Sequence, residues 1–107
     1  MNALGRTCAV LALVAGIAAT PPPIYTITVY ASGAQVHAKF VADGVTQTAF
    51  VPLGKKLTFD YDVVPAKLAF DITGCGRTQS KTIVVPPGHP GALFTIHANC
   101  LIVIGSR

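Results

Sequence analysis

The chain has 107 residues, which is enough for one domain, and carries a formal net charge of +4 with 51% hydrophobic residues. It contains neither tryptophan nor glutamate, and its basic residues are scattered along the sequence. No basic run is interleaved with stacking aromatic residues, which excludes a nucleic-acid-binding module.

The N-terminal segment has the pattern of a secretory signal. Arg6 precedes an apolar run from Cys8 to Ala19 that ends in small residues. The run is shorter than the roughly 20 residues that cross a bilayer, and no other stretch signals a membrane. We expect residues 1–19 to be a signal peptide and residues 20–107 to form a single exported domain, secreted, periplasmic or in the cell envelope. An uncleaved N-terminal anchor is the alternative.

Alternating polar and apolar residues predict strands over 24–30 and 35–41, joined by a turn in which Gly33 is free to take positive φ. We expect these two strands to form a hairpin. Asp43-Gly44 then favours a two-residue hairpin leading to a strand over 45–51. For that strand two inward faces are open: Val45, Gln47, Ala49 and Val51, or Phe50 with two threonines.

The most regular alternation runs from residue 56 to residue 63 and resumes from 68 to 73. A hairpin would bring its apolar residues opposite one another: Val63 and Leu68, Tyr61 and Phe70, Phe59 and Ile72. Since a slip of one residue would turn this set toward solvent, burial favours that register. We predict this hairpin as the core of a β domain.

Beyond Arg77, a polar lead-in over 78–81 precedes a short apolar strand over 82–85, and a proline-rich loop follows. The last segment, 92–104, is long for one strand, so we expect a bulge or break near Asn99. Short strands at regular spacing, with a turn signal at each joint, predict an antiparallel immunoglobulin-like sandwich of about seven strands.

Cys75 and Cys100 are the cysteines that remain after removal of the N-terminal segment, and an even pair in an exported chain predicts a disulfide. Closing a loop of about 25 residues stabilises the fold by roughly 3 kcal/mol. Isolated cysteines and dispersed histidines do not match the ligand spacing of a zinc site.

The residues of catalytic type form no motif, so we expect a protein that is not an enzyme and has no cofactor. In the predicted hairpin Asp60 lies opposite Asp71, with Asp62 on the same face, and like charges placed so destabilise a sheet. Solvation, a neighbouring lysine or a bound cation such as calcium would offset this repulsion.

The final apolar run comprises Leu101, Ile102, Val103 and Ile104. It fits either a strand buried on both faces or an exposed apolar edge that pairs with a protein partner or with a second copy.

The segment from Tyr25 to Gly33, together with Cys75 and Cys100, resembles the small accessory proteins of mycobacterial lipid exporters. That resemblance implies an N-terminal hydrophobic segment, an exported β-sandwich and an accessory role in an envelope lipid transporter. From the residues themselves we expect a non-enzymatic binding or accessory module. The alternatives are a structural protein that assembles through its C-terminal strand and the transporter subunit.

Overall fold

The structure is a computed structural model that describes residues 24–106, so the expected signal peptide lies outside the described residues. Within this range, eight strands and one short 3₁₀ turn follow one another: β1 (Tyr25–Tyr30), β2 (Val36–Ala42), β3 (Val45–Val51), β4 (Lys56–Tyr61), β5 (Lys67–Gly74), β6 (Arg77–Val84), β7 (Gly91–Ile96), η1 (Ala98–Cys100) and β8 (Ile102–Ser106).

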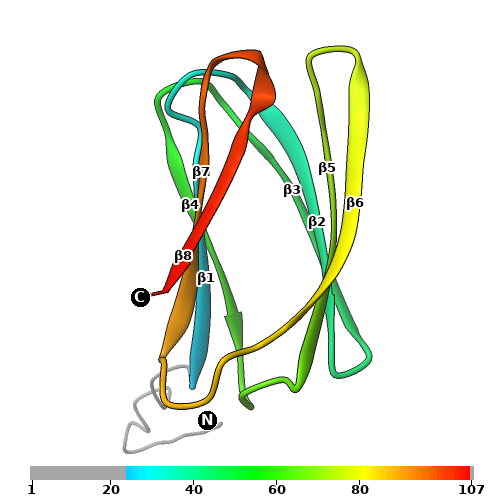
Figure 1. The fold of residues 1–107 in the computed structure, drawn as a ribbon, viewed down its shortest axis with the longest axis vertical. Coiled ribbons are helices and arrows are strands. Elements are labelled where there is room, and N and C mark those ends of the chain that lie inside the picture. Colours follow the sequence, from blue (N-terminus) through cyan, green and yellow to red (C-terminus); the bar gives the residue numbers. More distant parts are fainter. Residues whose placement is uncertain (1–23, 107) are drawn as a thin grey trace, which may run out of the picture.

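The strands form two four-stranded sheets that pack face to face, in the orders β4-β1-β7-β8 and β3-β2-β5-β6 (Figure 1). All neighbours are antiparallel except β1 and β7, which are parallel. The predicted sandwich and its disulfide are confirmed, with eight strands in the described residues instead of about seven. In the immunoglobulin order the first, second, fifth and fourth strands share a sheet, whereas here β1 and β4 lie in one sheet and β2 and β5 in the other.

Four phenylalanine rings, two from each sheet, occupy the centre of the core. Phe94 of β7 lies 5.1 Å from both Phe40 of β2 and Phe70 of β5, and Phe40 lies 5.0 Å from Phe59 of β4. All these contacts are edge-to-face, the arrangement that aromatic quadrupoles favour. The ring cluster therefore joins the two layers.

Two predicted hairpins are wrong, although their strands exist. Tyr61 of β4 lies opposite Tyr25 of β1, and Phe70 of β5 lies opposite Phe40 of β2 in the other sheet. The residues between β4 and β5 carry the chain from one sheet to the other, as do those between β1 and β2. Inward residues that we expected side by side in one sheet therefore belong to opposite layers.

The hairpin between β2 and β3 is confirmed, with positive φ at Asp43 (50°) and Gly44 (75°). β3 follows the first of the two predicted alternatives: Val51 is buried while Phe50 is 44% exposed. Val45, at the start of the strand, is the exception, because it is half exposed.

The break predicted near Asn99 is confirmed, since η1 separates β7 from β8 and Asn99 has a φ of 62°. The reason given for Gly33 is wrong. Gly33 is not among the residues with positive φ. It is needed for close approach, because a Cβ there would overlap the backbone nitrogen of Ala98.

Candidate binding groove

The sandwich has two lateral sides, where edge strands of the two sheets face each other, and these sides differ in how well side chains cover the core. On one side, the Gln47 amide Nε2 of β3 donates to the Asp60 carbonyl of β4 over 2.8 Å. The Tyr61 hydroxyl beside it donates to the Val45 carbonyl over 3.5 Å. Side chains thus tie β3 to β4, and this edge of the core is covered.

On the other side, the edge strands β6 and β8 are tied together at one end. There the disulfide joins Cys75, in the β5–β6 turn, to Cys100 of η1, with their Cα atoms 6.0 Å apart. Gln79 Nε2 donates to the Cys100 carbonyl over 2.7 Å, and Arg77 donates to the Asn99 carbonyl over 2.9 Å. Further along, the two strands leave the core uncovered.

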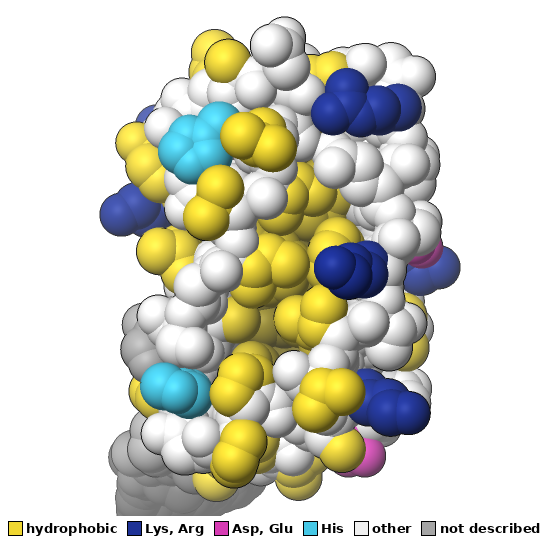
Figure 2. Space-filling view, in the orientation of Figure 1, with side chains coloured by type: hydrophobic (Ala, Val, Ile, Leu, Met, Phe, Trp, Pro, Cys, Tyr) yellow, Lys and Arg dark blue, Asp and Glu magenta, His cyan; other side chains and the backbone are white. Residues whose placement is uncertain are grey.

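A groove runs along this uncovered side, and Figure 2 shows it as an apolar strip between the sheets with basic side chains along one margin. It consists of two hollows that share Ile104, with volumes of about 280 and 160 Å³. The first is lined by Phe70, Gln79, Ser80, Lys81, Ile102 and Ile104. The second continues past Tyr25, Ile83, Val84, Pro86, Gly91, Ala92, Gly105 and Ser106.

The floor of the groove consists of side chains that face the core and yet remain accessible. In β8, Ile102 lies opposite Ile96 and Ile104 lies opposite Phe94, and both partners are fully buried. Directly opposed residues of an antiparallel pair point to the same face, so both β8 isoleucines face inward. Ile104 is nevertheless 39% exposed, because β6 does not close over it.

The inner face of β6 carries a lysine. Lys81 lies opposite the buried Phe70, so its side chain also leaves the strand toward the core side. It lines the first hollow, and no aspartate is among the described residues that line either hollow. An inward-pointing charge on an edge strand discourages pairing with other sheets, and here it also makes the groove electropositive.

The second hollow has one buried phenol. Tyr25 is almost fully buried at the start of β1, and desolvation raises the pKa of its hydroxyl. Tyr25 therefore stays neutral at physiological pH and adds no charge to the groove.

The predicted partner-binding residues are divided between two faces of β8. Ile102 and Ile104 line the groove, whereas Val103 points to the outer face and is 49% exposed. Leu101, which precedes the strand, is 60% exposed. Of the two alternatives for this run, burial on both faces is wrong.

The predicted aspartate cluster is also wrong. Asp60 lies opposite Thr26 and accepts a 2.9 Å hydrogen bond from its hydroxyl, whereas Asp71 of the other sheet lies 4.0 Å from Lys39 Nζ. Asp60 and Asp62 instead line a hollow with Asp43 beside the closed edge. Within residues 24–106, no set of three or more acidic, histidine or cysteine side chains is placed to hold a metal ion.

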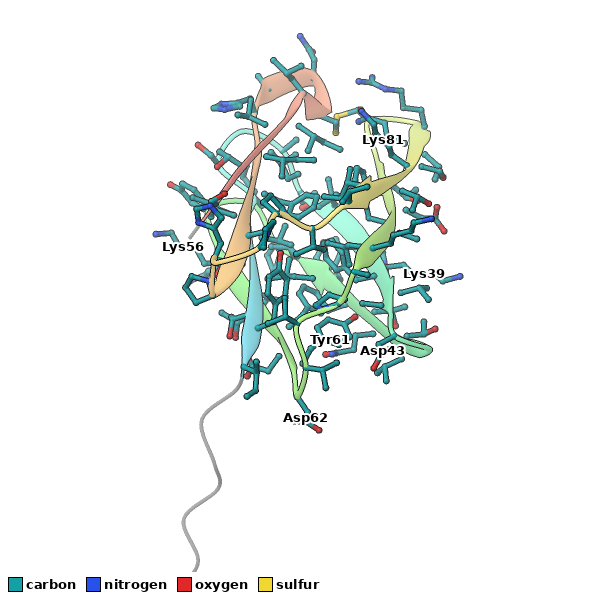
Figure 3. The ribbon with its side chains drawn as sticks, turned by 60° about the horizontal axis from the view of Figure 1, so that its bottom comes forward. Lys39, Asp43, Lys56, Tyr61, Asp62 and Lys81 are labelled. Carbon is teal, nitrogen blue, oxygen red and sulfur yellow. A yellow bond between two sulfur atoms is a disulfide. The ribbon has the colours of Figure 1, made fainter. Side chains whose placement is uncertain are left out.

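The groove and the acidic hollow are well separated, since Figure 3 places Lys81 far from Asp43 and Asp62. The fold and the groove together define a disulfide-linked β-sandwich with one uncovered side.

The chain matches no protein-family model, no curated protein and no solved structure. Over the described range, no helix has the length and apolar character to cross a membrane.

Proposed function

We propose that this protein is a small exported, non-enzymatic binding module whose ligand site is the groove between β6 and β8. One observation carries the proposal: the core-facing side chain of Ile104 is 39% exposed along an uncovered edge. Contiguous exposed apolar surface favours binding, because covering it gains roughly 25 cal/mol per Å².

Export is supported by the disulfide. The bond joins the buried Cys100 to Cys75, which is exposed in the β5–β6 turn. Disulfide bonds form and persist in oxidising compartments. The links beside the groove suit binding as well. The disulfide closes one end, and at the other end β6 stays held to β5, because the buried Val85 donates a 3.0 Å backbone hydrogen bond to the Ala66 carbonyl. A pre-formed site loses little conformational entropy when a ligand binds.

The test uses N-phenyl-1-naphthylamine, a neutral dye that fluoresces in apolar surroundings. We expect it to bind the purified domain, and Ile104→Asp to weaken binding by about tenfold because a carboxylate would enter the apolar floor. Val103→Asp is the matched control, since it places the same charge on the outer face of the same strand. Failure of the dye to bind, or equal affinity of the two variants, would contradict the proposal, provided that thermal melts show both variants folded.

Self-assembly through β8 is the second candidate. β8 forms the edge of its sheet, and Val103 within the strand and Leu101 just before it are exposed, so a second copy can add its own edge strand there. Size-exclusion chromatography over a range of protein concentrations tests this. A dimer that Val103→Lys dissociates would favour assembly, whereas a monomer throughout argues against it. The transporter-subunit alternative rests on the sequence resemblance alone.

A further inference from the structure

We propose that the groove binds a single-chain amphiphilic anion, a medium-chain carboxylate whose alkyl chain lies on the apolar floor and whose head group meets Lys81. This inference rests on the proposed function and specifies the chemistry of its ligand.

The first argument is charge complementarity. Lys81 is the one charged side chain among the described residues that line the two hollows. The ion pair found in the described part of the chain joins Lys39 to Asp71 on the outer face, so the Lys81 ammonium has no carboxylate partner there. An ammonium above an apolar floor matches an anion that carries an apolar chain, and it opposes a cationic one.

The second argument is shape. From Lys81, which meets the head group, the lining residues of β6 continue to Val84, which corresponds to roughly 10 Å at the rise of a β-strand. An extended residue spans three backbone bonds, so this length matches an all-trans alkyl chain of about 8 carbons. The two hollows together fall within the roughly 300–1,000 Å³ typical of small-molecule sites.

The third argument concerns a peptide strand as the occupant. A strand inserted between two others needs about twice the 4.8 Å strand spacing. At the disulfide end the Cα atoms of Cys75 and Cys100 are 6.0 Å apart, and the side chain of Gln79 spans the gap to the Cys100 carbonyl. These links leave no room for a strand at that end, whereas an alkyl chain needs no backbone partner.

The experiment compares three ligands with the same chain length: sodium octanoate, octanol and octyltrimethylammonium. Each displaces the bound naphthylamine dye at concentrations below micelle formation, and amide chemical shifts of β6 and β8 report where it binds. We expect the carboxylate to bind at least fivefold more tightly than the alcohol, and the ammonium to bind most weakly. Added salt should reduce the advantage of the carboxylate.

Lys81→Gln should lower the affinity for octanoate by about fivefold and leave that for octanol unchanged. Lys67→Gln is the control, because it removes the same charge from an exposed position of the same sheet that lines neither hollow. Equal affinities for carboxylate and alcohol, or an equal loss in both variants, would overturn this inference while dye binding still upheld the groove.

A different occupant would be recognised in the same samples. Shifts of β6 and β8 amides that change on dilution without any ligand would show that a second copy fills the groove, and would overturn the inference. Absence of dye binding would instead refute the proposed function, so the two failures are distinguishable.

Discussion

Phe94 is the residue whose replacement tests the packing of the two layers most directly. It is fully buried at the centre of β7 and makes edge-to-face contacts with Phe40 and Phe70, which lie opposite each other in the other sheet. Phe94→Leu keeps an apolar side chain in place but removes both ring contacts.

The expected cost follows from these contacts. An edge-to-face pair contributes about 0.5–1.5 kcal/mol beyond the burial of its surface. Losing two pairs, with some loss of packing because leucine is smaller than phenylalanine, should lower the free energy of unfolding by about 2–3 kcal/mol. Phe70→Leu removes one ring contact, and should cost roughly half as much. A domain of this size should remain folded in both variants.

Urea unfolding followed by tyrosine fluorescence gives the free energies, with unchanged m-values as the check on two-state behaviour. Leu93→Ala is the matched control, because Leu93 neighbours Phe94 in β7 but points to the outer face, where it is half-buried. It should cost less than about 1 kcal/mol. A loss below about 1 kcal/mol for Phe94→Leu, or one equal to that of the control, would refute the assigned packing.

Three further outcomes are expected. Gly33→Ala should cost about 2 kcal/mol or more in thermal melts, since the new Cβ would overlap backbone atoms. Gly105→Ala, where a Cβ meets nothing within 4 Å, should be nearly neutral, and equal effects would contradict the close approach. Replacing Cys75 and Cys100 together by serine should cost roughly 3 kcal/mol, and alkylation with mass measurement should find no free thiol at either position in the native protein. Asp71→Asn should change stability by less than about 0.5 kcal/mol, because its ion pair is half exposed; melts with calcium and with chelator should coincide, and a calcium-dependent rise would refute this.

Side-chain alternation in the sequence is enough to place most strands and their inner faces, but it does not identify partner strands. Tyr61 and Phe70 both point inward, as the pattern predicts, yet they belong to different sheets. Alternation reports which face of a strand is apolar and must be buried. Two strands side by side in one sheet bury that face as well as two strands that face each other across the core.

β6 is the strand that the sequence predicts least well. It runs from Arg77 and so includes residues 78–81, the predicted polar lead-in. The sequence does not indicate a strand there, because its inner face carries Gln79 and Lys81 and so lacks apolar alternation. Polar residues are tolerated there because that face borders the open groove instead of a closed core. Local rules are often broken at functional sites. The uncovered edge itself depends on strand order, which no short stretch of sequence encodes.

The parallel pairing of β1 with β7 has a consequence for the order in which the chain folds. It joins residues as distant in sequence as Thr26 and Gly91, so one sheet cannot be completed until nearly all of the chain is present. Contacts between distant residues slow folding, and slow folding would suit the export that we propose, because a chain crosses an export channel unfolded. A fragment that ends at Val84 should therefore show no cooperative unfolding transition, and a sharp transition in that fragment would contradict this order of events.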